Sequence, residues 1–255
     1  MVNWLCNIFP ILETFYQLIV KNFAQYKYFN IFYYKMSEID FNYLLKYIII
    51  GDSAVGKSNI LTQYVYEKFS EEFLTTLGVE FASKNANVDN IVYRIQIWDT
   101  AGAENFRSIT RAYYKNSVCA FIVYDITSRS SFENVQVWLE DIHNQCPQTT
   151  LLVLVGNKID LEKDRQISYQ EGANFAEKNN MMFFETSAKT GQNIENLFLK
   201  SVEAINEKIQ EDYFDLSSGN CGIKKGNEVN NDNIVLNKEN VAKSDNNGGK
   251  CCYYY

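Results

Sequence analysis

The chain has 255 residues, of which 46% are hydrophobic and 22% are charged, and its formal net charge is -7. This hydrophobic content suffices for a packed core, and the length suits one large domain or one ordinary domain with tails. The acidic balance argues against nucleic-acid binding, which needs a basic face. The six cysteines show no Cys-x-x-Cys or Cys/His spacing and His143 is the only histidine, so a zinc site is not expected.

Residues 1–41 form an N-terminal extension rich in aromatic residues and Asn. Its segment WLCNIFPILETFYQLIV is hydrophobic, but it is short for a membrane span and is interrupted by a proline, a glutamate and a glutamine. Three interpretations stay open: a membrane-associating extension, an unstructured or partly helical leader, and translated upstream sequence before a true start at Met36. The last is favoured, because MSEIDFNYLLKY reads as a short lead into a strand.

Residues 42–210 alternate strand and helix patterns. The apolar runs at 44–51, 118–125 and 151–158 predict buried parallel strands, and MMFFET at 181–186 predicts a last strand. Two further strands, EFASKNANV and IVYRIQIW, flank Asp89-Asn90, which indicates a hairpin turn.

Helical spacing recurs between these strands. Phe132 to Ile142 shows it, with Ser130 or Ser131 as the expected cap, and residues 193–209 form a closing amphipathic helix. The alternation predicts an α/β fold with a doubly wound, mostly parallel six-stranded sheet, flanking helices, and ligands at the carboxyl ends of the strands. Residues 211–255 lack periodicity and are rich in Asn, Ser, Gly, Lys and Asp, so a disordered tail is expected.

A phosphate-binding loop is predicted at GDSAVGKS, which fits G-x-x-x-x-G-K-[ST] between a strand and a helix. Glycines allow successive backbone N–H groups to face phosphates, and the helix N-terminus adds positive charge. Lys57 would reach the outer phosphates and the Ser58 hydroxyl would ligate Mg²⁺. The residues assigned to nucleotide binding here are Gly51, Asp52, Ser53, Ala54, Val55, Gly56, Lys57, Ser58 and Asn59.

Two more motifs follow strands. In WDTAGAENF, Asp99 would hold the metal through water, and the Gly102 amide would meet the terminal phosphate. The second motif is NKID, which comprises Asn157, Lys158, Ile159 and Asp160. The carboxylate of Asp160 would accept two N–H donors from guanine, a pattern that adenine lacks. Taken alone, each motif also fits a solvated surface turn.

Five motifs in this order resemble the Ras superfamily of small GTPases: GKS, the Thr-x-Gly of TTLGVEF, WDTAG, NKID and ETSAK. LGVEF, YRIQIWDTAG, ITRAYYKN and FIVYDIT are similar to the Rab family, and YLLKYIIIGD with WLEDI to the Rabs numbered two, four and fourteen. The resemblance covers about residues 42–210 and the terminal cysteines. It implies a GTP/GDP switch with Mg²⁺ that regulates vesicle traffic at the cytoplasmic face of endomembranes (Golgi, ER-Golgi intermediate or endosomes) and cycles through the cytosol.

The resemblance also implies roles for single residues. Thr76, 18 residues beyond Ser58, would close on Mg²⁺ and the γ-phosphate, and Phe69 would flank the guanine. The loop behind the base would be Ser187, Ala188 and Lys189. An effector surface would be formed by the aromatic residues Phe81, Trp98 and Tyr113, for which core filling is the alternative.

One departure from the family concerns hydrolysis. The family pattern Asp-Thr-Ala-Gly-Gln-Glu becomes DTAGAE here, so Ala103 replaces the glutamine that orients the attacking water. A methyl group cannot do this, which predicts hydrolysis slowed by roughly 10²-fold. The alternative is that nothing changes, because TBC-type activating proteins supply both an Arg and a Gln in trans. Ala54 and Leu77 also differ from the commonest choices, but conservatively.

The ending KCCYYY resembles the Rab dicysteine terminus, which implies geranylgeranyl groups on Cys251 and Cys252. Two lipid chains anchor stably where one does not. Residues 211–250 carry five Lys against seven acids, so charge would not assist. An unmodified pair and a C-a-a-X frame are the alternatives.

Expected partners are an exchange factor, a TBC-type activating protein, a GDP dissociation inhibitor, effectors and the membrane, with no nucleic acid. Two other functions are considered: a GTP-loaded scaffold with negligible hydrolysis, and a P-loop kinase or ATPase. NKID argues against the second.

Overall fold

The computed structural model describes residues 41–71, 76, 79–101, 113–217 and 219–226. The expectations for the N-terminal extension, for Gly102 and Ala103, and for Cys251 and Cys252 lie outside these residues. Within them, no helix combines the length and the apolar character needed to cross a membrane.

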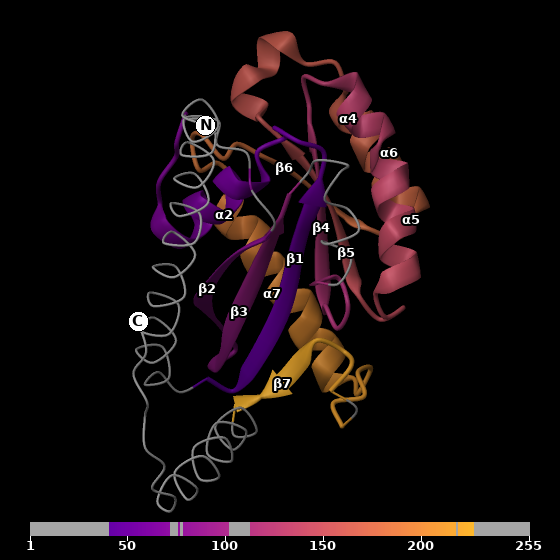
Figure 1. Ribbon diagram of the computed structural model, residues 1–255. Coiled ribbons are helices and arrows are strands. Elements are labelled where there is room, and N and C mark those ends of the chain that lie inside the picture. Colours follow the sequence, from indigo (N-terminus) through magenta and orange to yellow (C-terminus); the bar gives the residue numbers. More distant parts are fainter. Residues whose placement is uncertain (1–40, 72–75, 77–78, 102–112, 218, 227–255) are drawn as a thin grey trace, which may run out of the picture. The chain divides into compact units, whose positions relative to one another are not determined.

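A twisted sheet forms the centre of the domain (Figure 1). Its strands follow the order β2-β3-β1-β4-β5-β6, and every neighbouring pair on this path is parallel except the β2–β3 hairpin. The strands are β1 (Tyr43–Gly51), β2 (Val79–Val88), β3 (Ile91–Thr100), β4 (Cys119–Asp125), β5 (Leu151–Asn157) and β6 (Met182–Thr186). The predicted doubly wound, mostly parallel sheet is confirmed.

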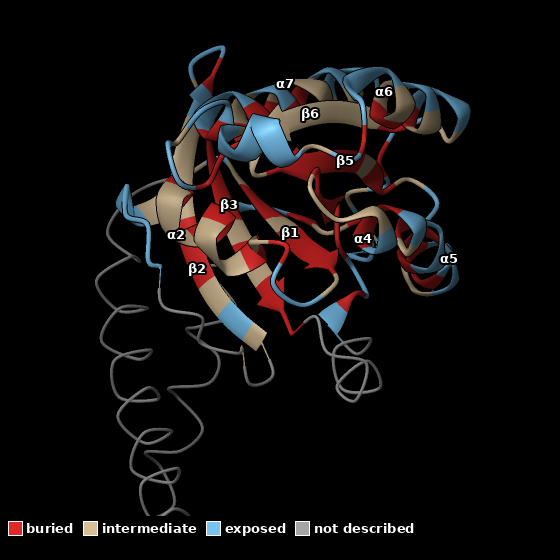
Figure 2. Ribbon diagram, turned by 90° about the horizontal axis from the view of Figure 1, so that it is seen from above, coloured by how far each residue is buried: buried red, intermediate tan, exposed pale blue. Residues whose placement is uncertain are grey.

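Helices cover both faces of the sheet, and strands coloured as buried lie between helices with exposed outer sides (Figure 2). One apolar cluster contains residues of α2 (Lys57–Tyr66) and α7 (Ile194–Gln210), and the other contains residues of α4 (Arg129–Glu133), α5 (Val135–Gln145) and α6 (Tyr169–Lys178). Along β1, Leu45, Tyr47 and Ile49 belong to the first cluster, whereas Ile48 and Ile50 belong to the second. Burial on both faces explains the continuous apolar run that predicted this strand.

The β2–β3 turn is the tight hairpin that the sequence predicts. Val88 pairs with Ile91, and the two residues between them, Asp89 and Asn90, have φ values of 53° and 64°. Two consecutive positive φ angles match the twist of the flanking strands, and Asp and Asn tolerate them.

The predicted cap of the helix after β4 was wrong. Helix α4 begins at Arg129, and the side chain of Ser128 accepts from the N–H of Ser131. Ser130 and Ser131 therefore lie inside the first turn, because the helix starts earlier than its apolar spacing indicates. The helical segment also divides at Asn134, which ends α4 and precedes α5.

A seventh strand, β7 (Ile223–Lys225), pairs antiparallel with the start of β1, and this strand was not predicted (Figure 1). The N–H of Lys46 donates to the carbonyl of Gly222 at 2.9 Å, and the N–H of Gly226 donates to that of Asn42 at 2.9 Å. Ile223 is 1% exposed. Residues 211–217 and 219–226 thus continue the folded domain, whereas the sequence analysis began the tail at 211. A three-residue strand with one apolar side chain is too short to show a period.

Candidate nucleotide-binding site

The phosphate loop joins the carboxyl end of β1 to the start of α2, as predicted. Gly51 has φ 139°, and a Cβ there would lie 2.2 Å from the carbonyl oxygen of Val123. Gly56 has φ 97°, and its Cβ would lie 2.3 Å from Nδ2 of Asn157. Both glycines are therefore required by the close approach of a neighbouring atom, from the backbone at Gly51 and from a side chain at Gly56, as well as by conformation. Ala54 also adopts positive φ, 63°, where its side chain is unfavourable.

Lys57 places a buried ammonium in the loop. The residue is 5% exposed, and its Nζ donates to the carbonyl of Asp52 at 2.7 Å. Burial lowers the pKa of Lys57, while the carboxylates of Asp99 and Asp52 act in the opposite direction. A cation that donates to a neutral carbonyl in a loop of backbone amides is suited to bind phosphate oxygens.

Ser58, Thr76 and Asp99 come together as predicted for a metal site. The Ser58 hydroxyl donates to the Asp99 carboxylate and lies 3.0 Å from Oγ1 of Thr76. Asp99 is fully buried, its Oδ1 has no hydrogen-bond partner among the described residues, and burial raises its pKa to about 7 against the opposing effect of Lys57.

These groups fit Mg²⁺. One carboxylate and two hydroxyls are hard oxygen donors, and Mg²⁺ is usually held by one or two carboxylates together with waters and phosphate oxygens. No group of three His, Cys, Asp or Glu is found in the described part of the chain, so a site made only of such ligands is not present there. When bound, Mg²⁺ would neutralise phosphate charge at this point.

The loops predicted to bind the base are joined through Asn157, which is 1% exposed. Its Nδ2 donates to the carbonyl of Val55 at 2.9 Å, and its Oδ1 accepts from the N–H of Ala188 at 3.1 Å and from Oγ1 of Thr186 at 3.2 Å. One amide side chain thus links the phosphate loop, the end of β5 and the loop after β6.

Asp160 is exposed, and its Oδ1 accepts from Oγ of Ser187 at 2.6 Å. That bond orients a carboxylate that stays accessible to a ligand. Lys158 pairs with Asp125 at 2.7 Å, and the exposed Lys189 pairs with Glu71 at 3.4 Å. The sequence analysis missed Asp125, although its position at the end of a buried strand, like that of Asn157, was a usable signal.

The predicted aromatic trio is assembled from β2, β3 and the segment before β4. The ring centroids of Phe81 and Trp98 are 5.0 Å apart, and those of Trp98 and Tyr113 are 5.4 Å apart. Tyr113 and Phe69 are each 36% exposed, while Phe81 and Trp98 are partly buried. The three rings thus form a continuous cluster that reaches the surface, which excludes simple core filling for Tyr113.

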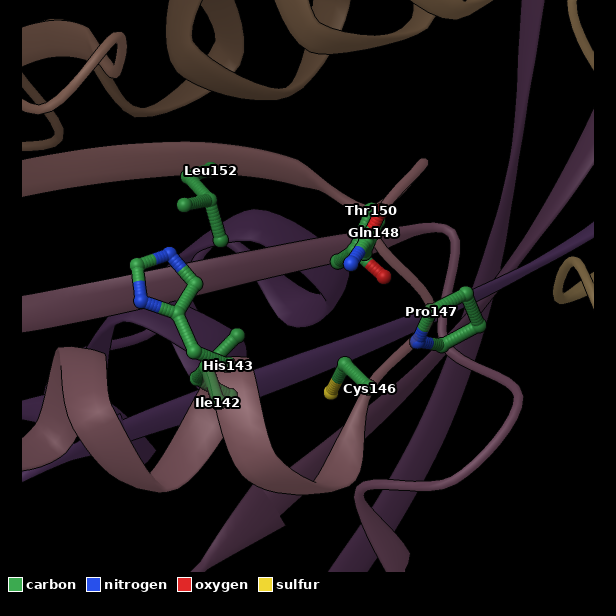
Figure 3. A pocket seen from close by; sticks show the side chains of 7 residues that line it. All are labelled: Ile142, His143, Cys146, Pro147, Gln148, Thr150 and Leu152. Atoms are coloured by element: carbon green, nitrogen blue, oxygen red, sulfur yellow. The ribbon is translucent and has the colours of Figure 1, made fainter.

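A separate pocket lies at the end of α5 and the start of β5 (Figure 3). It is lined by Ile142, His143, Cys146, Pro147, Gln148, Thr150 and Leu152. Asn157 of the NKID motif lies at the opposite end of β5, so this pocket is separate from the predicted nucleotide site. The Cys146 thiol donates to the carbonyl of Tyr114 at 3.1 Å, and burial raises its pKa to about 12, which disfavours the reactive thiolate.

A mostly parallel sheet that brings a phosphate-loop motif, a cluster of oxygen donors and the NKID motif to its strand ends has the arrangement of a P-loop GTPase domain. A profile described as the Ras family matches residues 46–207. The Dictyostelium discoideum protein named Ras-related protein Rab-2B is 54% identical over 172 residues, which span 67% of this chain and 84% of the relative.

The chain belongs to the Ras family of small GTPases and, within it, to the Rab proteins near the group numbered two, four and fourteen. It is a GTPase that uses GTP, GDP and Mg²⁺, and it acts in membrane traffic. The kinase and ATPase alternative is thereby excluded.

Proposed function

We propose that this protein is a membrane-anchored Rab switch whose intrinsic GTP hydrolysis is slow. The nucleotide-binding part of the proposal is carried by the junction at Asn157, which holds the phosphate loop and the loop after β6 in one hydrogen-bonded unit. Asp160, held by Ser187, reads the guanine edge, and Phe69 flanks the base. Lys57 and Gly102 contact the outer phosphates, and Ser58, Thr76 and Asp99 hold Mg²⁺.

Slow hydrolysis rests on Ala103, which stands where the family has glutamine. The methyl group leaves the attacking water without an orienting partner, whereas nucleotide and metal binding use other residues. An activating protein of the TBC class restores turnover by supplying the missing groups. Thr76 and Gly102 respond to the third phosphate, and Phe81, Trp98 and Tyr113 present the GTP-bound state to effectors.

Membrane attachment rests on Cys251 and Cys252, each carrying a geranylgeranyl group. Two chains give stable anchoring, which a GDP dissociation inhibitor reverses by covering them. The similarity to a protein named Rab-2B supports a location at the cytoplasmic face of endomembranes of the early secretory pathway.

Nucleotide competition tests the central part of the proposal. The purified protein, loaded with a fluorescent GDP, should exchange it for GTP or GDP but not for ATP at equal concentration. Displacement by ATP as readily as by GTP would contradict the assignment of Asp160.

Single-turnover hydrolysis tests the role of Ala103. Ala103→Gln should accelerate GTP cleavage by roughly 10²-fold while the nucleotide dissociation rates stay unchanged. If the substitution gives no acceleration, another feature limits turnover. If neither form hydrolyses GTP even with an activating protein, the protein is a GTP-loaded scaffold, the second function that Ala103 supports.

A further inference from the structure

The carboxylate of Asp52 is turned toward helix α5. Its Oδ1 accepts from the indole Nε1 of Trp138 at 2.7 Å, and its Oδ2 accepts from Nδ2 of Asn134 at 2.7 Å. Both oxygens of this phosphate-loop residue are thus used by a helical segment that lies more than 80 positions later in the chain. A carboxylate that receives two short bonds is held in position and in orientation.

The two donors form a rigid pair. Asn134 and Trp138 are one helical turn apart, so their side chains lie on the same face. The N–H of Asn134 donates to the carbonyl of Ser130, and the N–H of Trp138 donates to that of Asn134 at 3.2 Å. Trp138 is 1% exposed and belongs to the apolar cluster beneath α5, so its indole cannot follow a moving loop.

The main chain of Asp52 is engaged as well, because its carbonyl accepts from Nζ of Lys57 at 2.7 Å. Asp52 therefore connects α5 to the loop backbone on one side and to the phosphate-binding ammonium on the other. A loop fixed in this way keeps its amides in a phosphate-binding arrangement before the ligand arrives, and this preorganisation lowers the free-energy cost of binding.

We propose that Asp52 is a positioning residue that clamps the phosphate loop to α5 through Trp138 and Asn134 and thereby slows nucleotide release. Both carboxylate oxygens of Asp52 are used by α5, so the side chain acts through the loop that it holds. This inference rests on nucleotide binding at the phosphate loop, which the unsubstituted protein tests by itself.

The test is an exchange of partners measured by the dissociation rate of fluorescent GDP from the full chain with Mg²⁺. In Asp52→Asn the new amide can accept from only one donor and turns an N–H toward the other, so release should accelerate about tenfold. Asn134→Asp places two carboxylates face to face and should accelerate release at least as much.

The double substitution Asp52→Asn with Asn134→Asp restores the match of donor and acceptor. The new amide at position 52 can accept from the Trp138 indole and donate to the new carboxylate at position 134. Release should therefore return to within about threefold of the original rate, as expected for two positions coupled by direct contact.

Tyr93→Phe is the matched control. It removes a buried hydrogen bond of 2.6 Å to Asn206, at a distance from the phosphate loop, and should leave the release rate within about twofold while changing the melting temperature. Failure of the unsubstituted protein to bind guanine nucleotide would overturn the proposed function. If it binds but Asp52→Asn and Tyr93→Phe change release equally, or if the double substitution does not restore it, the clamp is refuted.

Discussion

The proposed nucleotide site has a base end, which comprises Asn157, Asp160 and Ser187, and a metal end, which comprises Lys57, Ser58, Thr76 and Asp99. The two ends differ in how many of their polar groups have hydrogen-bond partners in the protein. At the base end, Asn157 makes three hydrogen bonds and Asp160 is held by Ser187. At the metal end, the buried Asp99 has one oxygen without a partner among the described residues, and the Lys57 ammonium donates to the carbonyl of Asp52.

This difference predicts that the base end sets the affinity shared by GDP and GTP, whereas the metal end sets the response to the third phosphate. A preassembled base end contributes equally to GDP and GTP, because neither the base nor its contacts change when the third phosphate is lost. The metal end is completed only by its ligands, so its free energy depends on which phosphates and which metal are present. We therefore expect the effects of substitutions at the metal end to depend on Mg²⁺ and on the third phosphate. The effects of substitutions at the base end should depend on neither.

The largest effect is expected from Asn157→Ala. The substitution leaves the carbonyl of Val55, the N–H of Ala188 and the hydroxyl of Thr186 without this partner, which predicts a loss of roughly 10²–10³-fold in affinity. GDP and GTP should be affected equally, as equilibrium titration with fluorescent analogues would measure. The control is Asn179→Ala, which removes a side-chain hydrogen bond of 2.8 Å to the carbonyl of Phe175 on α6. It should leave both affinities unchanged. A loss of affinity confined to GTP would contradict the proposed difference between the two ends.

A core substitution away from both ends should separate stability from binding. Ile223→Ala shortens a buried side chain of β7 and leaves a cavity. It should lower the free energy of unfolding by about 2–4 kcal/mol, as large-to-small core changes do. Thermal unfolding would measure it, with the exposed Lys225 of the same strand changed to Ala as the control. Guanine preference and Mg²⁺ dependence should not change. An unaltered melting temperature would show that β7 is dispensable for the fold.

Ser58→Ala sharpens the comparison at the metal end. Loss of the hydroxyl between Thr76 and Asp99 should weaken apparent Mg²⁺ affinity by about 10–100-fold. In excess chelator, however, the GDP dissociation rate should match that of the unsubstituted protein. Ser187→Ala, which removes a hydroxyl from the base end, should accelerate GDP release with and without chelator. If both serines showed the same chelator dependence, the two ends would not be independent.

The smallest effect is expected at Ala54, whose φ of 63° disfavours a side chain. Ala54→Gly should stabilise the protein by about 0.5–1 kcal/mol, because relief of the left-handed conformation outweighs the added entropy of the unfolded chain. Calorimetry should show a rise of about 1–4 °C in melting temperature. A decrease would mean that the alanine methyl makes a favourable contact.

Much of the fold and site follows from local patterns in the sequence. Strands β1, β4 and β5 were predicted because burial on both faces demands continuous apolar runs. The phosphate loop and NKID were found because each lies at the end of such a strand, and Asp99 because it lies near the end of β3. Predictions failed where the deciding interaction is long-range. The pairing of β7 with β1, the bond between Asp52 and Trp138, and the ion pair between Lys158 and Asp125 join segments far apart in the chain. The cap at Ser128 was missed because the turn before Phe132 carries no apolar signal.

Strand β7 fixes the point at which the folded domain ends and the C-terminal segment with the proposed lipid-bearing cysteines begins. The strand pairs with Tyr43 to Leu45 at the start of β1, whereas the phosphate loop begins at Gly51, about 25 Å away along an extended strand. Only residues 227–250 then separate the sheet from the proposed lipid-bearing cysteines, a contour of at most about 85 Å, compared with about 140 Å for a tether that began at residue 211. On the proposed lipidation of Cys251 and Cys252, the membrane tether therefore leaves the domain at the end of β1 that is opposite the phosphate loop.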